Sequence, residues 1–234
     1  MKNTIQDKTK LVNSVFSEVY KKYDLMNDIM SFGIHRVWKD KFIDWMRPSQ
    51  SSTLIDVASG TGDIAKKFSL RVNNLSEITC VEPNNEMFQK GKNNLKTFNN
   101  IKWIKSQAET LPVKDNLYDF YSISYGIRNV TDINKTLREA YRVIKPGGRF
   151  MCLEFSKIDN ELINFLYTQY SNTIPIIGKY IVGSSEPYEY LVKSINSFYT
   201  QEQLSELIIK NGFTNVEYRN LSSGISAIHS GWKI

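Results

Sequence analysis

The chain has 234 residues, of which 41% are hydrophobic and 23% charged. A chain of this length and composition can bury a sizeable core, which excludes wholesale disorder and collagen-like or low-complexity classes. Its most apolar stretch, residues 174–183, contains Lys179 and is far shorter than the ~20 residues that cross a bilayer, so no membrane span is expected. The 30 basic and 24 acidic residues leave a formal charge of +6, which favours anionic surfaces without identifying one.

The chain contains two cysteines, Cys80 and Cys152, both inside apolar runs that predict buried strands. Two cysteines are too few for a disulfide framework or a Cys-rich zinc site, and we expect no metal site. The first eight residues lack the apolar core of a secretion signal. We therefore expect a reducing, cytoplasmic location.

Residues 9–47 are predicted to form helices interrupted by a loop. Their apolar residues recur at intervals of three and four, first at Leu11, Val15 and Val19 and then from Trp38 to Met46. Residues 1–47 also hold an excess of three positive charges, half of the chain's total, with the signs alternating as on solvated helix faces. We divide the chain into an N-terminal helical lid, residues 1–47, and a second domain, residues 48–234.

From residue 52 onward the pattern alternates between strand and helix. A helical stripe from Ile133 to Ile144 ends at Pro146-Gly147-Gly148, and Thr200 and Gln203 have the spacing of a capping box. Alternation of this kind predicts a mostly parallel sheet with helices on both faces, which binds ligands at the carboxyl ends of its strands. The expected strands are residues 53–58, 78–82, 101–104, 120–124, 149–155, 214–219 and 224–229.

A glycine-rich loop, Asp56-Val-Ala-Ser-Gly-Thr-Gly-Asp63, follows the first expected strand, and its glycines allow a ligand to approach the backbone. Glu82 ends the second strand, twenty residues after Gly62, where an acid can accept both hydroxyls of a ribose. The loop also fits a dinucleotide-binding fingerprint, but Asp63 at the helix N-terminus would repel a pyrophosphate. Asp56, Asp63 and Glu82 instead suit a cationic nucleoside such as S-adenosylmethionine. The alternative for Asp63 is that it merely caps the next helix.

Together with Pro146-Gly-Gly, this loop and Glu82 resemble the Rossmann-like class I methyltransferases. Longer strings narrow the resemblance to the ubiquinone/menaquinone biosynthesis C-methyltransferase family, over nearly the whole chain. These strings are Tyr23–Asp28, Met30–Arg36, Ser124–Asp132, Pro146–Arg149, Leu153–Lys157 and Asn220–Lys233.

The resemblance implies an α/β, Rossmann-like fold with a seven-stranded sheet, and S-adenosylmethionine-dependent C-methylation of a prenylated hydroquinone. The acceptor would be 2-polyprenyl-6-methoxy-1,4-benzoquinol, demethylmenaquinol or both. Three implied site positions depart from the residues usual in the family, because Ser59, Glu82 and Gln107 replace glycine, aspartate and asparagine. The implied cofactor-binding residues are Asp56, Ser59, Gly60, Thr61, Gly62, Glu82, Pro83, Met87, Gln107, Ala108 and Ser124.

Methylation of a phenolic ring carbon requires an electron-rich phenolate. Phenols titrate near pH ~10, so a base or a cation beside the oxygen is expected. Arg128 follows the fourth strand, and its guanidinium would stabilise phenolate charge or orient a water molecule. The alternative is a structural ion pair between Arg128 and Asp24 or Asp132. Candidates of second rank are Tyr23, His35 and His229.

Residues 155–199 contain nine aromatics in forty-five residues, 20% against 12% for the chain. We predict an apolar groove for the prenyl tail in an acceptor-side insertion over about residues 156–199, with plain helix-pair core as the alternative. Such a substrate resides in the bilayer, so we expect peripheral attachment at the inner membrane face or to other quinone-biosynthesis enzymes. Nucleic acid is not an expected partner, and a homodimer is left open.

Three other functions compete with this prediction. A nicotinamide-dependent reductase would use the Tyr141-x-x-x-Lys145 spacing, which we interpret as chance because Tyr141 lies on the apolar helix stripe. A nucleic-acid methyltransferase would suit the charge of +6, but no interleaved basic and aromatic module is visible. A catalytically silent lipid-binding or assembly subunit is the non-enzyme alternative, which the intact glycine loop and Glu82 disfavour.

Overall fold

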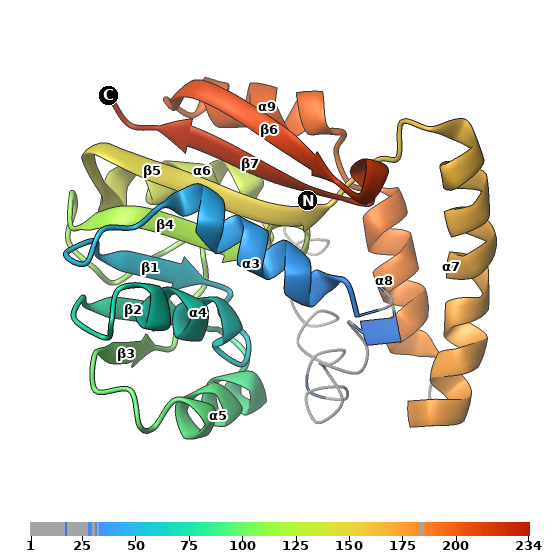
Figure 1. Cartoon of the computed structure of the whole chain (residues 1–234), viewed down its shortest axis with the longest axis horizontal. Coiled ribbons are helices and arrows are strands. Elements are labelled where there is room, and N and C mark those ends of the chain that lie inside the picture. Colours follow the sequence, from blue (N-terminus) through green and yellow to red (C-terminus); the bar gives the residue numbers. More distant parts are fainter. Residues whose placement is uncertain (1–16, 18–27, 30, 32, 183–184) are drawn as a thin grey trace.

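A single seven-stranded sheet forms the centre of the molecule (Figure 1). The computed structural model describes residues 17, 28, 29, 31, 33–182 and 185–234. The strand order is β3-β2-β1-β4-β5-β7-β6, and β7 runs antiparallel to both of its neighbours while β1 to β5 are parallel. The predicted fold class is confirmed. The strands are β1 (Leu54–Val57), β2 (Ile78–Val81), β3 (Ile101–Ile104), β4 (Tyr118–Ser124), β5 (Ile144–Phe155), β6 (Thr214–Leu221) and β7 (Ser226–Trp232).

The central strands are buried on both faces, as the continuous apolar runs predict for a parallel sheet. Every residue of β1 and β2 is buried, and Cys80 and Cys152 are fully enclosed on β2 and β5. Several predicted strand boundaries are off by one to three residues, and the largest error is at the junction of α6 and β5. Helix α6 (Ile133–Val143) ends before Ile144, which already pairs with Tyr118 of β4, so the chain turns earlier than Pro146. Lys145 contributes to this early end because a residue before proline disfavours the helical conformation.

Helices cover both faces of the sheet and bury two apolar clusters. One cluster joins the sheet to α3 (His35–Met46), α4 (Asp63–Arg71), α7 (Glu161–Val182) and α8 (Glu186–Asn196). The other joins it to α6 and α9 (Gln201–Lys210), and α5 (Asn85–Asn94) lies near β3. The predicted capping box of α9 is present, because Thr200 and Gln203 bond each other's backbone N–H.

Helix α3, at the end of the predicted lid, packs directly against this core. Its residues Trp38 and Phe42 are buried, and Trp45 accepts a hydrogen bond from Arg149 of β5 through its carbonyl oxygen at 2.9 Å. Arg149 is itself buried and lies over the rings of Trp45 and Trp232. One face of α3 therefore joins the hydrophobic core of the sheet domain.

The order of the strands reverses between β1 and β4, and this places the functional site. After β1 the chain moves outward to β2 and β3 and then crosses back to β4. The loops that follow β1 and β4 therefore lead away in opposite directions from the same edge of the sheet. Where they start, the two loops are close together, as a Cβ at Gly126 would lie only 2.6 Å from the Cβ of Ala58. Figure 1 shows α7 and α8 side by side beyond this edge. No helix in the described ranges is both long and apolar enough to cross a membrane.

Candidate functional site

A cavity opens at the carboxyl ends of β1 and β4. Two features of the glycine loop shape it. Gly60 has φ +56°, and a Cβ there would meet no atom within 4 Å, so this backbone faces open space. Gly62 has φ +88°, and a Cβ there would lie 2.5 Å from Leu95 Cδ1. The cavity is lined by Lys39, Asp56, Ala58, Ser59, Gly60, Thr61, Asp63, Ile64, Ser124 and Tyr125.

Asp56 is a buried carboxylate at the end of β1. Register pairs it with Ser122 of β4, whose hydroxyl donates to Asp56 Oδ1 at 2.6 Å. The other oxygen, Oδ2, has no hydrogen-bond partner in the described part of the chain, and neither has the buried hydroxyl of Ser124. Burial raises the pKa of Asp56 to about 7, although the hydrogen bond from Ser122 opposes the shift. Both atoms belong to residues lining the cavity, so a polar ligand that reached them would satisfy their hydrogen-bonding capacity.

Glu82 lies directly after β2 and holds the glycine loop. Its two carboxylate oxygens accept backbone N–H groups, Oε2 from Gly60 at 2.8 Å and Oε1 from Asn84 at 2.9 Å. Burial raises the pKa of Glu82 to about 7, and these two N–H groups lower it in part. Each oxygen keeps a second lone pair, so the carboxylate can accept ribose hydroxyls while it holds the loop. The side chain of Glu82 is one methylene longer than the aspartate usual in the family, and its Oε2 reaches back to the N–H of Gly60.

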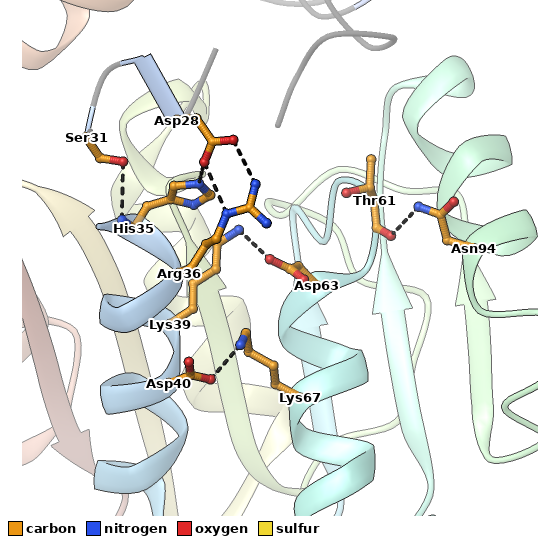
Figure 2. A network of polar contacts seen from close by, with 10 residues as sticks. All are labelled: Asp28, Ser31, His35, Arg36, Lys39, Asp40, Thr61, Asp63, Lys67 and Asn94. Carbon is orange, nitrogen blue, oxygen red and sulfur yellow. Dashed lines mark hydrogen bonds and ion pairs between the residues drawn. The ribbon is translucent and has the colours of Figure 1, made fainter. Parts of the chain in front are cut away.

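The serine at position 59 joins β1 to β2. Its hydroxyl donates to the carbonyl oxygen of Asp56 at 2.6 Å and accepts the N–H of Val81 at 3.0 Å. These bonds have no counterpart in a glycine, so the departure from the usual family residue adds a hydroxyl that stiffens the loop. Thr61 is buried, and its carbonyl oxygen accepts the side-chain amide of Asn94 from α5 (Figure 2).

The remaining predicted cofactor residues follow β2 and β3 along the chain. Pro83 is half-buried, and Met87 is buried on the first turn of α5, which Asn84 caps by accepting the Met87 N–H at 3.0 Å. After β3, Gln107 is exposed and Ala108 is buried. These four residues are absent from the lining of the cavity, so their contact with a cofactor stays a prediction.

Asp63 does not cap α4, contrary to the alternative considered for it. The N-cap is Gly62, and Asp63 instead forms an ion pair with Lys39 of α3 at 2.7 Å (Figure 2). Burial acts to raise the pKa of Asp63, but the Lys39 ammonium outweighs it and the pKa is lowered. Asp63 is therefore ionised near neutral pH and neutralised by Lys39, so Asp56 and Glu82 supply most of the uncompensated negative charge.

Arg128 lies in a 3₁₀ turn, η2 (Ile127–Asn129), directly after β4, and is buried. Its Nη1 donates to Glu154 Oε1 of β5 at 2.6 Å and to the carbonyl oxygen of Tyr125 at 2.8 Å. Arg128 does form the ion pair considered as the alternative, but its partner is Glu154 and not Asp132, which caps α6. The other suggested partner, Asp24, lies outside the described residues. Burial raises the pKa of Glu154, and the Arg128 guanidinium opposes that shift.

The three catalytic candidates of second rank lie in different parts of the chain, and the structure describes two of them. Tyr23 lies outside the described residues. His35 on α3 is buried with Nε2 2.8 Å from Asp28 Oδ1, and burial lowers its pKa. His229 on β7 faces the carbonyl oxygen of Gln201 at 3.0 Å, and burial lowers its pKa to about 4. Neither histidine lines this cavity, so a role for either in the reaction stays a prediction.

Sequence reasoning missed three residues that shape the site. Lys39 was hidden in an ordinary helical pattern, and Ser122 becomes a partner of Asp56 only through strand register. Glu154 belongs to the string Leu153–Lys157, but only the packing of β5 against the turn after β4 shows that it pairs with Arg128. The reductase pairing is not formed, because Lys145 pairs with Asp119 and Tyr141 lies beneath Lys233.

The sheet order, the glycine loop and the acid after β2 define a class I methyltransferase fold. The crystal structure of an S-adenosylmethionine-dependent methyltransferase from Thermotoga maritima, described as a possible histamine N-methyltransferase, matches with a TM-score of 0.66 at 20% identity. The match covers 95% of this chain and 100% of that one.

Residues 2–233 match the model of the ubiE/COQ5 methyltransferase family. Among curated relatives, the ubiquinone/menaquinone biosynthesis C-methyltransferase of Rickettsia bellii is 51% identical over 97% of this chain and 94% of its own length. The same enzyme of Rickettsia prowazekii is 52% identical over 96% and 93%. The chain belongs to the ubiE/COQ5 methyltransferase family, and the prediction that it is an enzyme, a methyltransferase, is confirmed.

The residues present fit S-adenosylmethionine, the predicted methyl donor. The orphaned oxygens of Asp56 and Ser124 offer hydrogen-bonding sites, and the bare backbone at Gly60 leaves room for a close ligand. Buried carboxylates at Asp56 and Glu82 favour a ligand that carries positive charge.

Because of these two carboxyls, the affinity for the cofactor should decrease as the pH is lowered. With a pKa of about 7, both become protonated in the ligand-free protein as the pH falls below 7, and a cationic ligand prefers their ionised forms. We expect the dissociation constant for S-adenosylmethionine to rise about tenfold per carboxyl between pH 8 and pH 6. Calorimetry in buffers of different ionisation enthalpy should detect proton release on binding.

The Asp56→Asn variant is the control for this measurement. It removes one of the two titrating groups, so it should bind more weakly at pH 8 but lose less affinity on acidification. An affinity that is constant from pH 8 to pH 6 in the wild-type protein, or proton uptake on binding, would contradict the assignment.

Proposed function

We propose that this protein transfers a methyl group from S-adenosylmethionine to a ring carbon of a prenylated hydroquinone in ubiquinone or menaquinone biosynthesis. The observation that carries the proposal is the full-length family match, supported by curated relatives of that name at about half identity. The cavity adds chemical support, because the glycine loop and the buried Asp56 line it, and the buried Glu82 after β2 binds the backbone of that loop.

The protein's contribution to such a reaction is positioning and the exclusion of water. S-adenosylmethionine supplies an electrophilic methyl group on a sulfonium. The ring carbon forms the new C–C bond as the C–S bond breaks, and that carbon then loses its proton. Glu82 would hold the ribose, while Asp56 and Ser124 would orient the polar methionine end through their unsatisfied oxygens.

Arg128 is the residue we propose for stabilising the acceptor phenolate. It follows Ser124 and Tyr125, which line the cavity, so it lies at the same edge of the sheet. Its ion pair with Glu154 and its bond to the Tyr125 carbonyl oxygen fix the guanidinium in place. Fixed positive charge is most effective where water is excluded, because no reorganisation is needed as negative charge develops. Tyr23 remains a catalytic candidate of second rank.

The acceptor would enter between this turn and the helix pair α7–α8. Tyr190 of α8 donates its hydroxyl to Asn129 Oδ1 at 3.0 Å, which joins the helix pair to the Arg128 turn. Some aromatics of this segment serve the core instead, since Phe155 and Tyr188 are buried in it. The predicted insertion over residues 156–199 thus combines core packing with the proposed acceptor side.

Measuring the quinone content of cells that lack this protein tests the proposed function. Mass spectrometry should find accumulation of the demethylated benzoquinone or naphthoquinone precursor, and the species that accumulates identifies the ring. Re-expression of the wild-type chain should restore the normal profile. A normal quinone profile in cells lacking the protein would reject the proposal.

Replacement of Arg128 should separate catalysis from cofactor binding. We expect Arg128→Lys to lower turnover by about 10²-fold or more, as loss of a fixed transition-state donor does, with little change in S-adenosylhomocysteine affinity. Removing the cation alone would leave Glu154 unpaired and cost about 3–5 kcal/mol of stability.

A double variant avoids that instability. Arg128→Met combined with Glu154→Gln removes both charges of the pair, so it should fold and bind S-adenosylhomocysteine while lacking turnover. Binding is measured by calorimetry and turnover with a short-chain quinol. Retained turnover in either variant would overturn the role proposed for Arg128.

We also propose peripheral attachment to the membrane that holds the acceptor. Half of the net positive charge precedes residue 48, and α7 exposes three apolar side chains at helical spacing, Leu162, Phe165 and Leu166 at 68%, 59% and 57%. Basic charge attracts anionic lipid, and exposed apolar side chains can enter the interface.

Sedimentation with vesicles containing anionic lipid measures this attachment. The bound fraction should fall as salt is raised, and replacing the three α7 residues with glutamine should lower it further. Leu75→Gln with Ile209→Gln is the matched control, because both side chains are apolar and exposed away from α7. Binding that responds to neither salt nor the α7 substitutions would refute the proposal.

A further inference from the structure

Three ion pairs join α3 to α4, and one of them differs from the other two. Figure 2 shows two of the three, Lys39–Asp63 and Lys67–Asp40. In the pairs Lys67–Asp40 and Arg71–Asp44, α3 supplies the acid and α4 the cation, and all four side chains are at least a quarter exposed. In the pair Lys39–Asp63 the order is reversed, and the cation comes from α3. This reversed pair is the one next to the cavity.

Lys39 is also the buried member of the set. Its side chain is 7% exposed, against 26% for Lys67 and 48% for Arg71. Lysine is seldom buried, because removing an ammonium from water is costly. Docking of α3 does not require this burial, since Trp38 and Phe42 already pack into the core and two other ion pairs reach α4. The position of Lys39 therefore calls for a role in the cavity.

The charges that line the cavity are uneven. Asp56 and Asp63 are acids, and Lys39 is the single cation among the described residues that line it. Glu82 is not part of this lining but accepts the backbone N–H of Gly60. The methionine end of S-adenosylmethionine, the cofactor of the function proposed above, carries an ammonium, a sulfonium and a carboxylate. The acids suit the two cations, but a carboxylate among acids needs a positive partner.

We propose that the Lys39 ammonium binds the carboxylate of the methionine moiety of the cofactor, while Asp63 holds Lys39 in place. An ammonium has three N–H donors, so Lys39 can keep its bond to Asp63 and donate to a second acceptor. The N-terminus of α4 adds favourable potential, because Gly62 leaves its first N–H groups without a side-chain cap. Helix α3 thereby contributes a binding residue as well as core packing.

Two ligands that differ by one group test this inference. Decarboxylated S-adenosylmethionine keeps the ammonium and the sulfonium but lacks the carboxylate. Calorimetry on the full chain should give at least tenfold weaker binding of S-adenosylmethionine to Lys39→Met than to wild type. The decarboxylated ligand should bind this variant as well as, or better than, it binds wild type, because a nearby positive charge has been removed.

Lys67→Met is the matched control, because it removes the cation of a neighbouring α3–α4 pair that does not line the cavity. It should leave the affinity for both ligands within twofold of wild type. Lys39→Arg should retain most of the preference for the carboxylate. If Lys39 served only to dock α3 or to position Asp63, Lys39→Met would weaken both ligands equally, and that result would overturn the inference.

The wild-type protein gives a second readout that does not depend on any variant folding. It should bind S-adenosylmethionine at least tenfold more tightly than the decarboxylated ligand, and equal affinities would also overturn the inference. A wild-type protein that binds neither ligand would instead refute the proposed use of this cofactor. Wild-type binding of S-adenosylmethionine without methylation of a quinol would refute only the proposed acceptor.

Discussion

Two carboxylates buried at the ends of β1 and β2 impose the main physical constraint on this structure. Asp56 and Glu82 are removed from water, and their hydrogen bonds come from a serine hydroxyl and two backbone N–H groups instead of from cationic side chains. An unsatisfied buried polar atom costs about 1–3 kcal/mol, and Asp56 Oδ2 is such an atom. The fold tolerates this cost at the point where a cationic ligand would offset it, as functional sites commonly do.

The same elements that build the core also position the site. Helix α3 packs its tryptophans and Phe42 into the core and, from the adjacent face, directs Lys39 to the cavity. Strand β5 anchors α3 through Arg149 and holds the Arg128 turn through Glu154. Two residues at the ends of β1 and β4, Ala58 and Tyr125, adopt positive φ angles of 53° and 55° that only strongly determined surroundings maintain. Stability and function are therefore coupled through a few shared contacts.

Local rules predicted the elements well where the pattern itself determines them. Continuous apolar runs marked β1 and β2, and the capping-box spacing marked the start of α9 at Thr200. The end of α6 was misplaced because its apolar stripe continues through Ile144, which pairing with β4 converts into strand. Asp63 was considered as a helix cap, but an ammonium from another helix offers a stronger partner than backbone N–H groups.

The sequence by itself determined the succession of strands and helices along the chain, the glycine loop, the acid that follows β2 and the family. These follow from periodicity, spacing and strings of residues close together along the chain. Only the tertiary structure decided which polar groups meet: Asp56 with Ser122, Arg128 with Glu154 and Lys39 with Asp63. Each of these pairs joins residues at least two dozen positions apart, and a spacing rule cannot predict them because register, helix docking and burial select the partners.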